Sequence, residues 1–221
     1  MAGRRSLLSP AALDDYIRDH TRAPDTVERA QHAATAELGG VATMRIDHEQ
    51  AVLTTLLTQL AAPAVAVEVG TFTGASAMAI ARGLPPDATL HCFDRSVDWT
   101  DVAQDFWEQA GVADRIRLHL GPADQGLAEL PDEPHVGLAF IDADKPGYVG
   151  YHDAIVPRLV PGGLLLVDNV LWSGDVVDPE VDDDDTRAIR AYNDHAADDD
   201  RLEGVILPIG DGLFVLRRTD D

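Results

Sequence analysis

The sequence predicts an α/β protein with a doubly wound, seven-stranded, mostly parallel sheet and a group of helices ahead of the first strand. Up to about Leu60 the apolar residues fall at helical spacings, as at Leu53, Leu56 and Leu57. From Ala64 onward, short apolar runs alternate with helical or connecting segments. This alternation is typical of βαβ units, which build parallel sheets.

The elements follow one another in a simple order. We expect strands at 64–70, 88–94, 115–121, 135–142 and 162–169, and helices at 76–84, 101–111, 147–160 and 183–199. The last helix starts with aspartates, which suit the positive end of its dipole. Two apolar runs within 202–218 flank Gly210-Asp211-Gly212, which predicts a closing β-hairpin with an antiparallel strand.

Length and composition favour a single domain over 1–221. The chain has 221 residues, 45% of them hydrophobic, which is enough for one substantial core. We divide it into an N-terminal helical segment, 1–60, and an α/β core, 61–221. No internal repeat or linker interrupts it.

The charge balance excludes several partners. The chain has 39 acidic and 17 basic residues, a formal net charge of −22, which repels nucleic acid and anionic membrane surfaces. Its one cysteine, Cys92, cannot form an intramolecular disulfide and is expected to be a small buried hydrophobe, so a reducing cytoplasm is predicted. We find no signal-peptide core and no apolar run of the roughly 20 residues that a membrane helix needs.

The first predicted strand ends in VEVGTFTGAS, which indicates a nucleoside site. Gly70 and Gly74 allow a tight turn, but their spacing differs from the G-x-G-x-x-G of dinucleotide sites. Glu68 would disfavour a pyrophosphate and favour a cationic ligand. Asp94, at the end of the second strand, can accept hydrogen bonds from ribose hydroxyls, although a turn or helix-cap role is an alternative. We therefore expect S-adenosylmethionine, which carries cationic groups and no phosphate.

Three oxygen-bearing side chains follow the fourth and fifth strands. Asp142, Asp168 and Asn169 should converge, because the carboxyl ends of neighbouring parallel strands share one edge of the sheet. All-oxygen ligation suits Mg²⁺, with Ca²⁺ or Mn²⁺ as alternatives. An Asp-Asn pair alone is more often a turn signal. The acidic runs at 182–185 and 198–200 are interpreted as solvated helix ends.

Lys145 is the only lysine among seventeen basic residues. An amine near a divalent cation, or away from water, can release its proton, whereas guanidinium does not. The sequence therefore favours Lys145 as a general base, with an incidental surface lysine as the alternative.

These motifs resemble those of the cation-dependent class I O-methyltransferases, the caffeoyl-CoA and catechol O-methyltransferase family. The resemblance extends from about Thr43 to Arg218 and implies a Rossmann-like methyltransferase fold. Its motifs are VEVGTFTGASAMAIA, GVADRIRLHLGPA, FIDADKPGYVGYHD, GGLLLVDNVLWSGDV and LPIGDGLFVLRR. It implies metal ligation by Asp142, Asp168 and Asn169, with Lys145 as base. The S-adenosylmethionine contacts that it implies are Met44, Glu68, Gly70, Ser76, Asp94, Ala123 and Asp142.

The resemblance also implies a mechanism. Two adjacent hydroxyls of a catechol-like acceptor chelate the cation, Lys145 removes a proton, and the phenolate attacks the sulfonium methyl. Trp172 resembles an aromatic wall of the acceptor pocket, with ordinary core packing as the alternative. Family members are commonly homodimers, so a homodimer is expected.

The acceptor is expected to be a small, uncharged catechol or polyphenol, with a caffeoyl-type acceptor as the alternative. Plant members of the family recognise a coenzyme A thioester through basic residues, but the basic residues near this N-terminus are few: Arg4, Arg5, Arg18 and Arg22. The acidic segment VVDPEVDDDDTR is expected to border the acceptor site. Two rival classes are a module that binds S-adenosylmethionine or a metal without turnover and a nicotinamide-dependent oxidoreductase. The missing G-x-G-x-x-G and the lack of an obvious tyrosine-lysine relay argue against the second.

Overall fold

A computed structural model describes residues 11–219, and over this range the predicted sheet is confirmed. The sheet has the strand order β3-β2-β1-β4-β5-β7-β6. Its strands are β1 (Val65–Val69), β2 (Thr89–Asp94), β3 (Ile116–Leu120), β4 (Val136–Ile141), β5 (Leu159–Val167), β6 (Leu202–Leu207) and β7 (Leu213–Arg218). The first five strands are parallel, and β7 is antiparallel to both of its neighbours.

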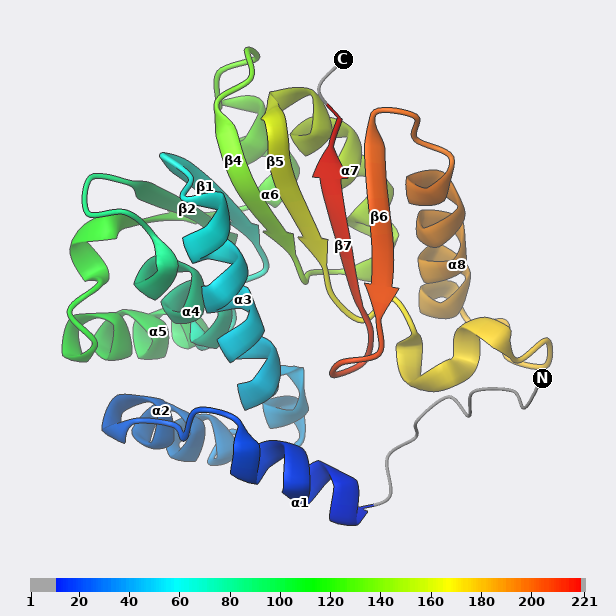
Figure 1. Cartoon of the computed structure of the whole chain (residues 1–221). Coiled ribbons are helices and arrows are strands. Elements are labelled where there is room, and N and C mark those ends of the chain that lie inside the picture. The colour runs from blue at the N-terminus through cyan, green and yellow to red at the C-terminus, as the bar shows by residue number, and fades with distance from the viewer. Residues whose placement is uncertain (1–10, 220–221) are drawn as a thin grey trace.

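Helices cover the sheet unevenly (Figure 1). The α-helices are α1 (Ala11–His20), α2 (Thr26–Ala36), α3 (His48–Ala61), α4 (Ala75–Gly83), α5 (Val97–Gln109), α6 (Ala123–Ala128), α7 (Tyr148–Ile155) and α8 (Asp184–Ala197). Short 3₁₀ segments are η1 (Gly39–Met44), η2 (Ala113–Arg115), η3 (Lys145–Gly147), η4 (Val156–Arg158) and η5 (Trp172–Val177). Helices α3, α4 and α5 pack on one face, and α6, α7 and α8 on the other.

Alternation along the strands builds the two halves of the core. Ala66 of β1 and Leu90 of β2 point toward α3, α4 and α5, whereas Val67 and Val69 point toward α6, α7 and α8. Successive side chains of a strand point to opposite faces, so a buried central strand needs apolar residues on both. Cys92 lies fully buried in the first half of the core, as expected.

Three boundaries differ by three or more residues from the sequence-based expectation. Helix α5 begins at Val97 rather than near 101, because the Ser96 side chain accepts from Trp99 N and caps the helix there. The other two lie between α7 and β5. The helix expected over 147–160 ends as an α-helix at Ile155, and β5 begins at Leu159 rather than near 162. Pro157 has no backbone N–H, so it suits the 3₁₀ turn that ends the helix. The start of the first helical segment, Ser9 and Pro10, lies outside the described residues, as do Arg4 and Arg5.

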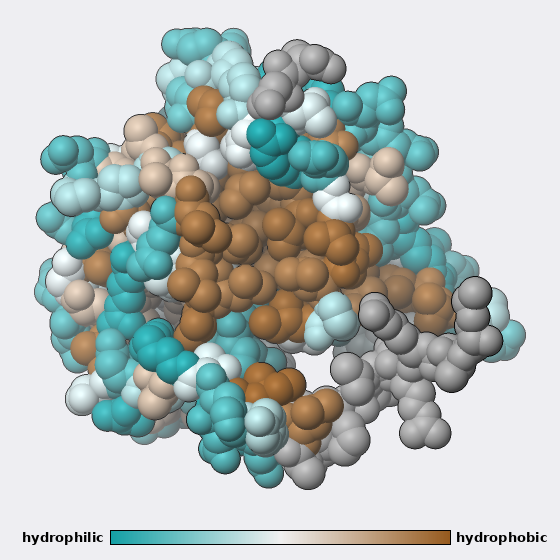
Figure 2. Space-filling model, in the orientation of Figure 1, coloured by the Kyte–Doolittle hydropathy of each residue, from teal (hydrophilic) through white to brown (hydrophobic). Residues whose placement is uncertain are grey.

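The face of β4, β5, β7 and β6 that α3, α4 and α5 leave open is apolar. Figure 2 shows a broad hydrophobic area over these strands. Strand register places Leu164, Val205, Leu207 and Val215 on this side, and Val205 is 55% exposed. We call these four residues the open apolar face. No helix within residues 11–219 has both the length and the apolar character needed to cross a bilayer.

Candidate active site

The main cavity lies at the carboxyl ends of the parallel strands, where the sheet changes direction. Because β1 and β4 are neighbours, the chain leaves them toward opposite edges of the sheet, and a crevice opens between the following loops. The cavity has a volume of about 860 Å³. The predicted site residues that line it are Met44, Gly70, Ser76, Asp94, Ala123, Asp142, Lys145, Asp168, Asn169 and Trp172.

The loop after β1 is built on glycine. Gly70 has φ +87°, and a Cβ there would lie 1.9 Å from the carbonyl oxygen of Asp142. Only glycine lets these two loops approach so closely. From the other side, helix α2 holds the loop, because Gln31 Nε2 donates to the Thr73 carbonyl at 3.1 Å and Thr35 Oγ1 lies 2.8 Å from Thr73 Oγ1. The N-terminal helices thus position the cavity wall.

Asp94 organises the same loop. Its Oδ2 accepts hydrogen bonds from the backbone N–H groups of Thr71 and Phe72, both at 2.9 Å, and its Oδ1 accepts from Ser96 N at 2.8 Å. Each carboxylate oxygen has two lone pairs, so the carboxylate keeps further acceptor capacity toward the cavity. Asp94 thus has the turn role considered for it, whereas the cap of α5 is Ser96, and the turn role is compatible with a ribose contact.

Glu68 is the one predicted site residue that is not among those lining the cavity. Its side chain is fully buried, and neither carboxylate oxygen has a hydrogen-bond partner among the described residues. Burial raises the pKa of Glu68 to about 7, although Ser76, Thr71 and Cys92 lie close enough to oppose that rise. An unpaired buried carboxylate is costly, so this position favours a cationic group nearby.

Lys145 joins the two predicted ligand loops. Its side chain is 10% exposed, and Nζ donates to Asp142 Oδ1 at 3.1 Å and to Asn169 Oδ1 at 2.6 Å. Nζ also lies 4.8 Å from the ring centre of Tyr148 and 5.4 Å from that of Trp172. Oxygens of two of the three expected ligands, Asp142 and Asn169, therefore meet at Nζ.

The surroundings of Asp168 disfavour the charged form of its carboxyl group. Burial first, and then the nearby charge of Asp142, raise the pKa of Asp168 to about 7. A bound divalent cation would relieve both effects. The donor set, two carboxylates and one amide oxygen, fits a hard divalent ion such as Mg²⁺.

Sequence reasoning missed two residues of this site. Tyr148 lies fully buried one helical turn after Lys145, and its hydroxyl is 2.6 Å from Lys145 Nζ. The i,i+3 spacing of the two residues is the signal that could have identified it. The sequence pattern marks Asp211 only as part of a hairpin turn, but Asp211 lines the cavity and accepts a hydrogen bond from Ser173 N. Burial raises the pKa of Asp211.

The fold and the site define a class of protein, the Rossmann-like O-methyltransferases. Among solved structures, the O-methyltransferase TomG from Streptomyces achromogenes, in complex with S-adenosylmethionine, matches with a TM-score of 0.85 and 26% identity over 94% of this chain and 96% of its own. An O-methyltransferase from Bacillus cereus, in complex with S-adenosylhomocysteine, matches with a TM-score of 0.85 and 25% identity over 94% of this chain and 97% of its own.

Residues 22–219 match the family model described as O-methyltransferase. Caffeoyl-CoA O-methyltransferase 1 of Zea mays is 33% identical over 98% of this chain and 88% of its own length. Tricin synthase 1 of Oryza sativa subsp. japonica is 33% identical over 97% of this chain and 90% of its own length. The chain belongs to the O-methyltransferase family, and the enzyme class expected from the sequence is confirmed.

Proposed function

We propose that this enzyme transfers a methyl group from S-adenosylmethionine to one hydroxyl of a vicinal diol on a small, uncharged phenolic acceptor, and that it requires a divalent cation. The observation that carries this proposal is the convergence of Asp142, Asn169 and Lys145 within the cavity. A simple methyl-donor site does not need a buried amine among oxygen ligands.

Residues at the β1 and β2 ends would hold the methyl donor. S-adenosylmethionine, when bound, supplies a methyl group on a positively charged sulfur. Seven aspartates but only three basic residues line the cavity, so its field favours a cationic ligand. Gly70 allows close approach of the backbone, and Asp94 offers acceptor oxygens to a ribose. The Glu68 carboxyl, without a hydrogen-bond partner, lies behind the loop, where a cationic ligand would favour its ionised form. The contacts inferred for Met44, Ser76 and Ala123 belong to the same proposal.

Asp142, Asp168 and Asn169 would hold the cation, with Mg²⁺ as the first candidate. When bound, the cation supplies positive charge that favours the ionised form of an acceptor hydroxyl. Lys145 would accept the proton, a role supported by the contact of its Nζ with Asn169 Oδ1 and by its presence in the cavity lining. Trp172, whose ring lies beside Nζ, would form one wall for a planar acceptor.

The charges at the cavity favour a neutral acceptor over a coenzyme A thioester. Of the two arginines that line it, Arg95 pairs with Asp144 at 3.1 Å, and Arg45 donates to Gln31 Oε1 and to the Ile46 carbonyl. Both are thus already engaged, and Asp175, the residue directly before the acidic segment, also lines the cavity. A net charge of −22 likewise disfavours nucleic acid and membrane partners. The buried Cys92, a free thiol, suits a cytoplasmic enzyme.

The enzyme is also proposed to form a homodimer through the open apolar face. An exposed, contiguous apolar surface of this kind is typical of protein interfaces. In a two-fold symmetric dimer, the open apolar face of one copy would pack against the same face of the other. Val205→Asp should convert a dimer to a monomer in size-exclusion chromatography with light scattering. A wild-type monomer at micromolar concentration would contradict this assembly.

The deciding experiment measures methyl transfer from S-adenosylmethionine to a panel of vicinal diols, such as caffeic acid and a dihydroxyflavonoid, with Mg²⁺ and then with EDTA. Mono-methyl ether that appears with Mg²⁺ and is abolished by EDTA supports the proposal. Transfer that EDTA does not affect would overturn the metal requirement. Cofactor binding without transfer to any diol would instead favour a non-catalytic module or another acceptor class.

A further inference from the structure

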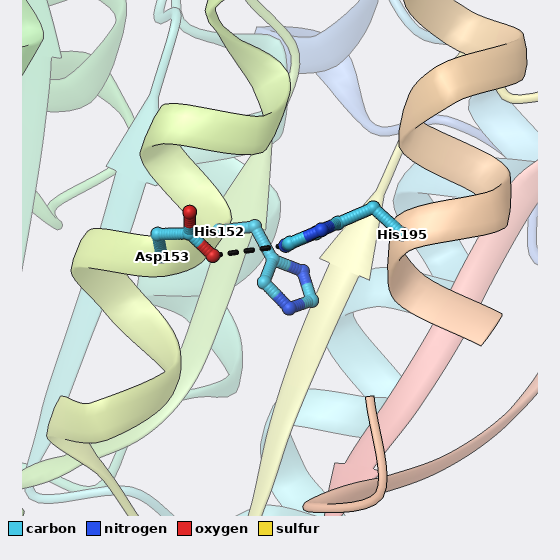
Figure 3. A group of neighbouring side chains, drawn as sticks. All are labelled: His152, Asp153 and His195. Atoms are coloured by element: carbon cyan, nitrogen blue, oxygen red, sulfur yellow. Dashed lines mark hydrogen bonds and ion pairs between the residues drawn. The ribbon is translucent and has the colours of Figure 1, made fainter. Parts of the chain in front are cut away.

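A second cluster of metal-binding side chains lies outside the cavity, between α7 and α8. It contains His152 and Asp153 of α7 and His195 of α8, and one ligand atom of each lies within 4.8 Å of those of the other two (Figure 3). His195 Nε2 is 2.9 Å from Asp153 Oδ1. None of the three residues lines the cavity of the proposed active site.

The surroundings of His152 prepare its ring as a ligand. Its side chain is fully buried, and Nε2 lies 3.0 Å from Asp199 Oδ2. A carboxylate that accepts from one ring nitrogen orients the ring and leaves the other nitrogen for a metal. Here that atom is Nδ1, whose contact with the Tyr192 hydroxyl is long, at 3.5 Å. Burial lowers the pKa of His152, which favours the neutral ring that a metal requires. Arg201 in turn holds Asp199, with its Nη2 2.7 Å from Oδ2.

We propose that His152, Asp153 and His195 bind a divalent transition-metal ion of the Zn²⁺ type and thereby fasten α7 to α8. Two imidazoles and one carboxylate form a nitrogen-rich set that suits Zn²⁺, whereas the all-oxygen set of the active site suits Mg²⁺. Ligands of a tetrahedral Zn²⁺ lie about 3.3 Å apart, given bond lengths of about 2.0 Å. The cluster therefore needs only small side-chain rotations to close around an ion, and water can complete the coordination.

A metal ion at this site would stabilise the folded protein and would take no part in the methyl-transfer reaction. His195 and Asp153 are partly exposed, which gives an ion access from solvent, while His152 anchors the site in the core. Helix α7 also carries Tyr148, whose hydroxyl contacts Lys145. A metal ion that links α7 to α8 would therefore also help to hold Tyr148, and through it Lys145, in position. This inference does not depend on the proposed acceptor or on catalysis.

The test is isothermal titration of the whole enzyme with Zn²⁺ in excess Mg²⁺, accompanied by thermal unfolding. The wild type and Asp168→Asn should each bind one Zn²⁺ at this site, and Zn²⁺ should raise the midpoint of unfolding. His195→Ala should weaken that binding by at least about tenfold and remove the shift in the midpoint. Asp153→Asn should also weaken binding, and this second variant keeps the test valid if His195→Ala folds poorly.

A matched control comes from the other histidine pair in the described part of the chain. His119 Nε2 lies 2.9 Å from His91 Nδ1, so His119→Ala also removes one member of a histidine pair. It should leave the Zn²⁺ affinity unchanged. The proposal is overturned if the wild type binds no Zn²⁺ at micromolar concentration, if His195→Ala and Asp153→Asn bind like the wild type, or if His119→Ala alone abolishes binding.

Discussion

The Lys145 Nζ atom lies 2.6 Å from the hydroxyl oxygen of Tyr148, and that hydroxyl donates in turn to the carbonyl oxygen of Asp168 at 3.2 Å. One buried tyrosine therefore connects the proposed base to the backbone of a proposed metal ligand. The arrangement fixes the amine along a direction that its four-carbon side chain alone would not define, since long flexible side chains otherwise sample many rotamers.

Replacing Lys145 with arginine tests the general-base role. Lys145→Arg keeps a positive charge but cannot release a proton, so kcat should fall by about 10² to 10⁴ near neutral pH. Binding of S-adenosylmethionine, measured by titration calorimetry, should remain within a few-fold of wild type. Arg29→Lys on the exposed surface of α2 is the control and should retain full activity. Turnover close to wild type in Lys145→Arg would remove the assignment.

Tyr148→Phe tests the positioning of that base. The variant removes one hydrogen-bond partner of Nζ and the donor to the Asp168 carbonyl, so kcat should fall about tenfold, equivalent to about 1.4 kcal/mol. The KM for S-adenosylmethionine should stay unchanged, because Tyr148 does not line the cavity. A purely structural tyrosine would instead lower the unfolding temperature and leave kcat of the folded enzyme intact.

Gly70→Ala tests the close approach of the two loops. The added Cβ would meet the carbonyl oxygen of Asp142 at 1.9 Å, so the loop must move and S-adenosylmethionine binding should be lost. Gly111→Ala separates this clash from backbone strain, because Gly111 also has positive φ, +68°, but has open space around it. That control should cost about 1 to 2 kcal/mol of stability and leave cofactor binding intact. Equal binding by both variants and the wild type would contradict the role of Gly70.

Glu68→Gln tests the buried carboxylate through its effect on pH-dependent stability. The folded-state pKa, about 7, is above the ordinary value of 4.5, so the folded protein holds more protons than the unfolded one between these values. Stability should therefore fall as pH rises from about 4.5 to 7, by on the order of 3 kcal/mol at most in the ligand-free protein.

Glu68→Gln should remove this part of the pH slope and be more stable than the wild type above pH 7. Denaturant unfolding at several pH values measures the slope, with the exposed Glu108→Gln as control. If Glu68→Gln and the wild type keep the same slope, Glu68 is not the group responsible.

The active-site residues at strand ends were accessible to sequence reasoning because the apolar runs locate the ends of parallel strands. Gly70, Asp94, Asp142 and Asp168 each follow such a run, and a parallel sheet brings these ends to one edge. Residues that reach the cavity from elsewhere carry no such signal. Asp211 lies in the turn between β6 and β7, and only the placement of β7 beside β5 brings it to the site.

The order of the strands, most of the helices, the acidic balance and the residue types that carry the chemistry, including the single lysine, could be predicted from the sequence; the short helix α6 was not. These are properties of local pattern and composition. Which side chains meet could not be predicted in this way. The contact of Tyr148 with Lys145, the orphaned Glu68 carboxylate, the open apolar face and the pairing of His152 with His195 all depend on how distant segments pack, and local pattern does not encode those distances.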